Sequence, residues 1–395
     1  MVKPGWVEAT IGAFVDNKQI SIQTGPFGTV LSASEYVDHG IPVISVREIR
    51  QGYIQLFDET PAVSSLTYRK LPQFALEPFD LVFARKGSVD RSALIPENSQ
   101  KLFLGSDGIR LRFSNPILAQ IVFHCVQSSQ TRQFLTVSAY GTTMAGLNET
   151  IISSIPISIP CDSKEQQRIA EALSDVDELI ASLEKLIEKK EAIKQGAMQE
   201  LLTGKRRLPG FSGEWEEKRL GDICKIVMGQ SPDSKFYNND RKGLPLIQGN
   251  ADIENRKTIM RSYTTQVTKK AYCGEIIFTV RAPVGNVARA TFDCCLGRGV
   301  CALRDAPPLI YQTLIFLEPH WKELSSGSTF DSISTDTLEN TKVFLPKDMQ
   351  EGNCISLILD EMDKEIRDIG KKLEKSLSVK QGMMQQLLEG KFRIV

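Results

Sequence analysis

The stretch SKEQQRIAEALSDVDELIASLEKLIEKKEAIKQGAMQELL, residues 163–202, decides how the rest of the chain is interpreted. Its apolar residues recur at alternating intervals of four and three, which is the heptad pattern of a coiled coil. The positions that form this seam are Ile169, Leu173, Val176, Ile180, Leu183 and Ile187. No proline interrupts the run, and Gly204 follows it as a stop signal. A helix with one narrow apolar stripe is marginal alone in water, so we expect this helix to have a partner.

The same chain supplies that partner. A second seam with the same intervals consists of Ile355, Leu359, Met362, Ile366, Ile369 and Leu373, each 186 positions after its counterpart. The offset extends beyond the seam, because MQELLTGK at 198–205 returns as MQQLLEGK at 384–391. We therefore predict two long helices that pair within the chain as an intramolecular coiled coil.

The bulk composition excludes several classes of protein. The chain has 395 residues, which predicts more than one domain, and its hydrophobic content of 41% is enough for sizeable cores. The eight cysteines form no C-x-x-C pair, which favours reduced thiols over a disulfide framework or a zinc site. No apolar run reaches transmembrane length, and no signal peptide is recognisable. We expect a cytoplasmic protein with no membrane partner.

A globular segment precedes each predicted helix. Residues 1–160 contain short apolar stretches between glycine-rich turns, which is typical of a domain with many short strands. Residues 215–346 repeat this frame, since GIPVI at 40–44 returns as GLPLI at 243–247 while the interior diverges. The predicted fold class is α+β. The predicted order is a first globular domain (1–160), a first long helix (161–204), a linker (205–214), a second globular domain (215–346), and a second long helix with a tail (347–395).

The chain ends continue the repeat. Lys205 and Trp215 are separated by ten positions, and the same number leads from Lys391 to the C-terminus and on from Met1 to Trp6. If the termini lie together, the molecule is a closed ring of two similar units. The helices must then run antiparallel, and we expect a dumbbell with approximate two-fold symmetry.

This arrangement resembles the specificity subunit of type I restriction-modification enzymes over essentially the whole chain. The resemblance is carried by EQQRIAEALSDVDELI at 165–180 and by LLTGKRRLPGFSGEWEEKRLGDI at 201–223. It implies that each globular domain is a target recognition domain that reads one half of a split double-stranded DNA sequence. It also implies that the helices set the spacing and dock two methyltransferase subunits, which restriction or translocase subunits could join. The second helix departs from the pattern, because its start at 347–355 keeps only Glu351 and Ile355.

Candidate DNA-binding residues lie in matched places of the two halves. Arginine can grip guanine and asparagine or glutamine can grip adenine, each through two hydrogen bonds. Arg47 and Asn250 each lie three residues after a matched isoleucine, and Arg85 and Arg281 are expected to open matching turns. The remaining candidates are Lys86, Arg91, Gln248, Asn286, Arg289 and Arg298, together with the polar loop residues Thr142, Thr143, Ser328 and Thr329. Each could equally be an ordinary surface charge or turn residue.

Charge and motifs limit the chemistry of the chain itself. Each globular segment is nearly balanced in charge, which predicts modest affinity for phosphates from this chain alone. No P-loop and no metal-ligand spacing among the three histidines is present, so we predict a non-catalytic subunit without a metal. By the resemblance, S-adenosylmethionine, ATP and Mg would belong to partner subunits. The rival interpretation is a coiled-coil scaffold that binds proteins and no nucleic acid.

Overall fold

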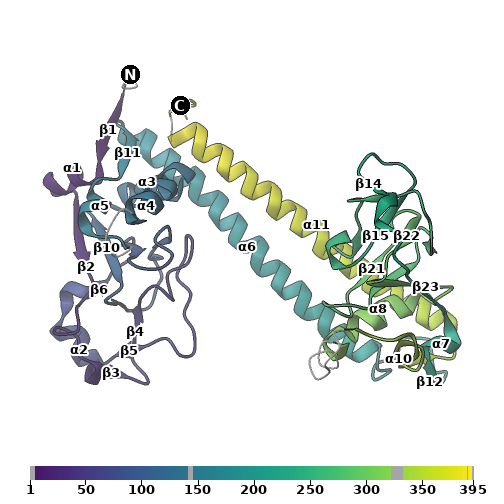
Figure 1. Cartoon of the computed structure of the whole chain (residues 1–395). Coiled ribbons are helices and arrows are strands. Elements are labelled where there is room, and N and C mark those ends of the chain that lie inside the picture. Colours follow the sequence, from purple (N-terminus) through teal and green to yellow (C-terminus); the bar gives the residue numbers. More distant parts are fainter. Residues whose placement is uncertain (1–4, 141–145, 322–331, 389, 394–395) are drawn as a thin grey trace. The chain divides into compact units, whose positions relative to one another are not determined.

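The computed structural model describes residues 5–140, 146–321, 332–388 and 390–393. The chain divides into two compact units. The first unit comprises Met1–Glu184 and Lys372–Val395, and the second comprises Lys185–Lys371. Each unit therefore contains one globular domain and a segment of each long helix (Figure 1). The expectation of an α+β chain with two similar domains and two long helices is confirmed.

Three sheets build the first unit. One has the strand order β2-β10-β7-β8, another β3-β5-β4-β9-β6, and the third pairs β1 with β11. The strands are β1 (Trp6–Thr10), β2 (Ile20–Thr24), β3 (Tyr36–Val37), β4 (Ile41–Ile44), β5 (Ala62–Val63), β6 (Ala75–Leu76), β7 (Leu81–Ala84), β8 (Ser92–Leu94), β9 (Leu102–Leu104), β10 (Gly108–Phe113) and β11 (Pro156–Pro160). The helices are α1 (Ile11–Asp16), α2 (Ser65–Lys70), α3 (Pro116–Gln127), α4 (Ser129–Tyr140) and α5 (Glu149–Ser153), with short 3₁₀ turns at Ala33–Glu35 and Pro72–Phe74.

Strand alternation divides the first unit into two cores. On β7, Leu81 and Phe83 pack in the core that includes α3. Val82 and Ala84 point to the opposite face and pack in the core that includes β4 and β9. Because side chains alternate along a strand, a fully apolar strand implies that both faces are covered. Helix α3 begins where it does because Asn115 accepts a hydrogen bond from the Leu118 N–H and Pro116 occupies the first turn.

The second unit repeats this plan. Its sheets have the orders β13-β23-β20-β21-β17-β16, β14-β18-β15-β22-β19 and β12-β24. The strands are β12 (Trp215–Arg219), β13 (Lys225–Met228), β14 (Tyr237–Asn238), β15 (Leu244–Ile247), β16 (Ile253–Glu254), β17 (Lys257–Thr258), β18 (Tyr263–Thr264), β19 (Lys270–Ala271), β20 (Ile276–Thr279), β21 (Val287–Arg289), β22 (Cys294–Leu296), β23 (Val300–Arg304) and β24 (Lys342–Pro346). The helices are α7 (Leu220–Ile223), α8 (Pro308–Phe316) and α10 (Thr335–Glu339), with 3₁₀ turns at Ser234–Phe236 and Asn250–Asp252.

The long helices are α6 (Ser163–Leu201) and α11 (Met349–Leu388), close to the predicted bounds. All twelve predicted seam residues are buried or half-buried. Burial is complete at the ends that join a globular core, as at Leu173 and Leu359, and partial toward the middle. Leu183, which we expected to be buried, is half-buried; it lies one residue before the boundary between the units and belongs to none of the core clusters of the described residues.

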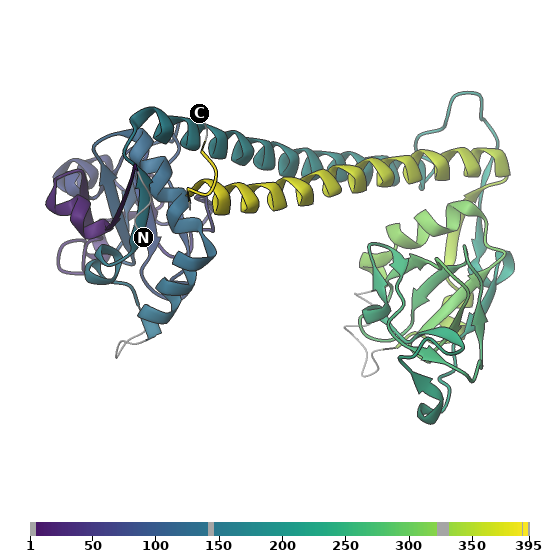
Figure 2. The same ribbon diagram turned by 90° about the horizontal axis from the view of Figure 1, so that it is seen from above.

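Ion pairs show the direction of the helix pair within each unit. In the first unit Lys380 pairs with Asp177, and Arg393 Nη2 lies 2.6 Å from Glu165 Oε2. In the second unit Lys194 Nζ lies 2.6 Å from Asp363 Oδ1, and Lys190 Nζ lies 2.7 Å from Glu365 Oε1. Residue numbers rise along one helix as they fall along the other, so the segments are antiparallel in each unit. Figure 2 shows the yellow end of α11 beside the start of α6 in the first unit.

Candidate nucleic-acid interface

Four loops of the first unit meet at one edge of its strands. Strands β2, β4, β7 and β9 end at this edge and β8 and β10 begin there, as their pairing directions require. Backbone hydrogen bonds join the loops: the Gly105 N–H donates to the Ile44 carbonyl at 2.8 Å, and the Arg85 N–H donates to the Asp107 carbonyl at 2.8 Å. We call the loops 25–31, 45–50, 85–91 and 105–107 the first loop edge.

The second unit has the same construction. The Gly297 N–H donates to the Ile247 carbonyl at 2.8 Å, and the Val280 N–H donates to the Gly299 carbonyl at 2.9 Å. The loops 229–233, 248–252, 280–286 and 297–299 form the second loop edge. Loops that a rigid strand scaffold holds in place are the usual carriers of binding residues.

Glycines allow the loops of each edge to approach closely. A Cβ atom on Gly25 would lie 1.8 Å from the Gly105 carbonyl oxygen, and one on Gly229 would lie 2.1 Å from the Gly297 carbonyl oxygen. Any side chain at these positions would push the loops apart. The matched glycines therefore fix the same backbone frame in both units and leave the neighbouring positions free to differ.

Buried carboxylates stiffen the loop that follows β4 and its counterpart after β15. Glu48, which is 1% exposed, accepts a hydrogen bond from the Ser45 N–H at 3.1 Å. Asp252, which is 7% exposed, accepts one from the Gln248 N–H at 2.7 Å. A buried acceptor that satisfies loop N–H groups holds the exposed residues between them in fixed positions.

Four predicted DNA-binding residues lie on the first loop edge. Arg47 is exposed and forms a 2.7 Å ion pair with the exposed Glu59, and its guanidinium lies 4.7 Å from the centroid of the Phe57 ring. Arg85 stacks on the exposed ring of Phe27, with 5.1 Å between guanidinium carbon and ring centroid. The remaining two are Lys86 and Arg91.

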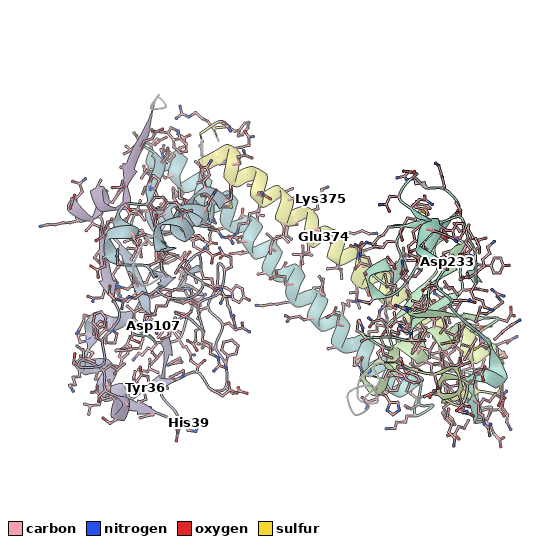
Figure 3. The ribbon with its side chains drawn as sticks, viewed as in Figure 1. Tyr36, His39, Asp107, Asp233, Glu374 and Lys375 are labelled. Carbon is pink, nitrogen blue, oxygen red and sulfur yellow. The ribbon has the colours of Figure 1, made fainter. Side chains whose placement is uncertain are left out.

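Asp107 is an acidic member of the same edge. Lys86 Nζ lies 3.1 Å from Asp107 Oδ1. Partial burial and the Asp107 charge raise the pKa of Tyr36 on β3; both residues are labelled in Figure 3. The first loop edge is thus a mixed surface in which basic groups outnumber acidic ones. This arrangement positions cations for phosphates or base edges without a strongly basic domain.

Five predicted residues lie on the second loop edge, namely Gln248, Asn250, Arg281, Asn286 and Arg298. All are exposed except Asn286, which is half-buried. Arg289 does not lie with them. Its guanidinium lies 4.1 Å from the Tyr311 ring centroid and 3.5 Å from Asp360 on α11, so it packs against the helices rather than facing outward at this edge.

The structure corrects the predicted match between Arg85 and Arg281. We expected Arg85 to correspond to Arg281, but the backbone hydrogen bonds above equate Arg85 with Val280. Isolated bridges equate Lys86, which pairs with Gly146, with Arg281, which pairs with Ser332. The two turns, 85–91 and 280–286, have the same length, and the sequence comparison was one position out because it aligned arginine with arginine.

Four predicted residues, Thr142, Thr143, Ser328 and Thr329, lie outside the described residues.

Sequence reasoning missed a set of charged residues that obey the 186-position offset. Asp177 and Lys380 in the first unit correspond to Asp363 and Lys194 in the second, with the roles of the two helices exchanged. The heptad search considered only apolar positions, so it passed over these ion pairs. Applying the offset to charged residues would have found them.

Two further features concern the part of the chain that the structure describes. Within those residues, no group of three His, Cys, Asp or Glu side chains is placed to hold a metal ion. None of the described helices is both long and apolar enough to cross a membrane.

Comparisons with known proteins agree with this geometry. The family model for the type I restriction modification DNA specificity domain matches the chain twice, at residues 20–195 and 212–378. The chain therefore belongs to the family of type I restriction-modification DNA specificity proteins and contains two copies of its domain. The first match begins in a globular domain and the second just before one, and each extends into the long helix that follows.

Named relatives and solved structures are similar along most of their length. The chain is 27% identical over 376 residues to a putative type I restriction enzyme MjaX specificity subunit from Methanocaldococcus jannaschii, covering 90% of this chain and 88% of that protein. It is 25% identical over 340 residues to the MjaVIII specificity subunit of the same organism, covering 75% and 77%. Its fold matches the S subunit of a type I restriction-modification system from M. genitalium, with a TM-score of 0.69, 16% identity, and coverage of 98% and 96%.

Proposed function

We propose that this chain is the DNA-recognition subunit of a type I restriction-modification complex. Each loop edge would read one half of a bipartite double-stranded target. The observation that carries the proposal is the pair of loop edges: one backbone frame, built twice, presents different side chains at matched positions. Two copies of a scaffold with different outward residues suit the reading of two different half-sites.

The loop edges provide both kinds of contact that DNA recognition needs. Basic side chains such as Lys86 and Arg298 can contact phosphates and fix the register of the protein on the duplex. Side chains such as Asn250 and Arg91 can reach base edges in the major groove. The near-neutral charge of each domain limits the phosphate contribution. We therefore expect tight binding only with partner subunits that surround the DNA.

The long helices would connect recognition to chemistry. We propose that they set the spacing of the half-sites and dock two methyltransferase subunits, which restriction or translocase subunits can join. S-adenosylmethionine, ATP and Mg would then act in those partners, and this chain would direct them to adenines that are flipped out of the duplex. The relatives are named specificity subunits, which supports a recognition role rather than an enzymatic one. We expect the complex to work in the cytoplasm.

The rival interpretation, a scaffold that binds proteins and no nucleic acid, receives no support from the comparisons. Its main argument was the zero net charge of the chain. The mixed charge of the loop edges weakens that argument, because cations can gather locally in a chain that is neutral overall.

A domain exchange tests the proposal. The cut points follow the backbone hydrogen bonds from the Ile11 N–H to the Ile155 carbonyl (3.0 Å) and from the Leu220 N–H to the Thr341 carbonyl (2.9 Å), which are equivalent in the two units. Replacing residues 11–155 by the same segment of a related subunit keeps β1, β11 and both helices intact. Methylome sequencing of the host should show one altered half-site and one unaltered half-site.

The matched control exchanges residues 220–341 and should alter the other half-site. Changes in both half-sites after a single exchange would contradict the assignment of one half-site to each domain. A chain that, with its co-purified partners, selects no sequence from a random duplex library would contradict DNA recognition itself.

A further inference from the structure

The two loop edges present different side chains at one matched position. The strand registers pair Phe83 with Ser92 and Phe278 with Val287. One residue before Ser92 and Val287 stand Arg91 and Asn286, whose carbonyls accept hydrogen bonds at 3.0 Å from the residues that end β7 and β20. Arg91 and Asn286 therefore occupy equivalent places.

The loop after β4 is one residue shorter than its counterpart after β15. The Glu48 carbonyl accepts a hydrogen bond from the Gln55 N–H and the Asp252 carbonyl accepts one from the Ile259 N–H, each at 2.9 Å, so Glu48 and Asp252 are equivalent. Arg47 therefore corresponds to Ala251 rather than to Asn250, and the exposed Asn250 lies one position earlier in a loop that the first edge does not match residue by residue.

The asparagines of the second edge contact each other. Asn286 Nδ2 donates a hydrogen bond to Asn250 Oδ1 at 2.5 Å. Thr279 Oγ1 accepts a 2.9 Å hydrogen bond from the Asn286 N–H, and Asp252 caps the turn that begins at Asn250. The two amides are held on rigid backbone. Among the described residues, nothing bonds to Asn286 Oδ1 or Asn250 Nδ2, so one acceptor and one donor remain available side by side.

An available acceptor beside an available donor matches one base edge in the major groove. Adenine presents the N6 amino donor next to the N7 acceptor, whereas guanine presents two acceptors, O6 and N7. Asn286 Oδ1 can accept from N6 while Asn250 Nδ2 donates to N7. Guanine would place O6 against the Asn286 oxygen, two acceptors with no proton between them, and the second edge should reject it.

The first edge offers the opposite chemistry. Arg47 is paired with Glu59, whereas the half-buried Arg91 makes no side-chain hydrogen bond or ion pair among the described residues. A free guanidinium presents donors only, which suits the two acceptors of guanine. The equivalent positions therefore favour different bases.

We infer that the Asn250–Asn286 amide pair reads an adenine in the half-site of the second domain, and that Arg91 reads a guanine in the half-site of the first. This inference rests on the proposed function, because it assumes that the loop edges face DNA. It adds which residues set specificity in each half and which base each one selects.

The test selects binding sequences from a random duplex library with the full chain and its co-purified partner subunits. Asn250→Asp replaces the donor by an acceptor, which favours the N4 amino group of cytosine over adenine. One adenine of one half-site should lose its preference by roughly tenfold or more, with the other half-site unchanged. Arg91→Asn should relax one guanine of the opposite half-site.

Asn239→Asp is the matched control, because this exposed residue makes the same charge change in the connection before β15, away from its loop-edge end. It should leave both half-sites as in the wild type. Asn286→Ala adds no charge and serves as a second variant if Asn250→Asp melts at a lower temperature. It should relax the same adenine.

Three outcomes overturn the inference. They are an unchanged adenine preference in both variants, a uniform weakening for all sequences, and a change in the half-site of the first domain. Failure of the wild-type complex to select any sequence would instead overturn the proposed function. The two failures are therefore distinguishable in one experiment.

Discussion

Both units anchor a buried glutamate at the start of a long helix, but different chain segments reach it. In the second unit the linker supplies Arg207, whose guanidinium donates to Glu351 at 2.8 and 2.7 Å, and Trp215 Nε1 donates to the same carboxylate at 3.3 Å. In the first unit Arg393, near the end of the chain, donates to Glu165 at 3.0 and 2.6 Å. Both arginines and both glutamates obey the 186-position offset.

The adjoining strands repeat the same junction. The Cys161 N–H donates to the Gly5 carbonyl at 2.8 Å, and the equivalent Lys347 N–H donates to the Glu214 carbonyl at 2.9 Å. The difference lies in continuity: an unbroken linker leads from α6 into β12, whereas two separate end segments meet beside β1. The comparison teaches that the repeat unit is defined by its ion pair and strand frame, and not by the path of the chain.

The largest expected effect comes from removing one of the two carboxylates. The Glu351 side chain is fully buried and Arg207 is 28% exposed, whereas Arg393 is 55% exposed beside Glu165. Breaking the less exposed pair leaves a poorly hydrated cation, so Glu351→Gln should lower the free energy of unfolding by about 3 kcal/mol and Glu165→Gln by about 1 kcal/mol. Urea unfolding of the two variants at pH 7 measures both.

The pH dependence adds a second check on this pair. The hydrogen bonds from Arg207 lower the pKa of Glu351. A carboxyl whose folded pKa is depressed stabilises the fold above its unfolded pKa, and the contribution is lost as the pH falls through the folded value. The difference in the free energy of unfolding between the wild type and Glu351→Gln should therefore become smaller below about pH 4.5. Equal losses for both variants, or a larger loss for Glu165→Gln, would contradict the ranking.

A smaller effect should separate the two units in mild acid. In the first unit the buried His124 on α3 has its Nδ1 3.9 Å from Asp177, which pairs with Lys380. In the second unit the group that faces the equivalent Asp363 is Gln312 on α8, whose Nε2 donates to it at 3.0 Å. Among the described residues, a histidine faces the ion pair in the first unit and a neutral amide takes its place in the second, so the group at this place titrates in mild acid in the first unit alone.

Burial lowers the pKa of His124 to about 3, with a further contribution from the Lys380 charge. The unfolded chain binds a proton at His124 near pH 6.5, whereas the folded chain keeps this side chain neutral down to about pH 3. The free energy of unfolding therefore falls as the pH drops below 6.5 toward the folded pKa. The first unit should lose about 2 kcal/mol by pH 5, and His124→Gln should remove most of that dependence. Hydrogen exchange at pH 7 and pH 5, followed separately in the two units, measures this loss of stability. Equal acid sensitivity of the two units would contradict the role given to His124.

Periodicity and repetition in the sequence predicted the frame of this molecule. The heptad residues gave both long helices to within a few positions, and the offset gave the equivalence of the two domains. The loop edges were harder to predict. Arg85 and Arg281 were mismatched because the backbone hydrogen bonds that define equivalence join loops distant in sequence. The position of Arg289 could not be predicted, because its ion pair with Asp360 joins residues that are far apart in the sequence.

The smallest effect should come from moving the break in the chain from one junction to the other. Arg393 already lies beside the N-terminal segment, since a Cβ atom on Gly5 would be 3.8 Å from its Nη2 atom. Gly210, in the linker of the second unit, is exposed, and a Cβ atom there would meet no neighbour within 4 Å. A permutant that joins Val395 to Met1 and begins at Gly210 breaks no hydrogen bond of either strand frame. It should unfold within about 1 kcal/mol of the wild type, because only loop entropy changes. It should also direct methylation to the same bipartite sequence.

A second permutant that opens at Glu351 cuts the anchored ion pair and serves as the control that should fail. If the Gly210 permutant folded but methylated a different sequence, the two junctions would not be equivalent, and the ring formed by the two repeats would be wrong.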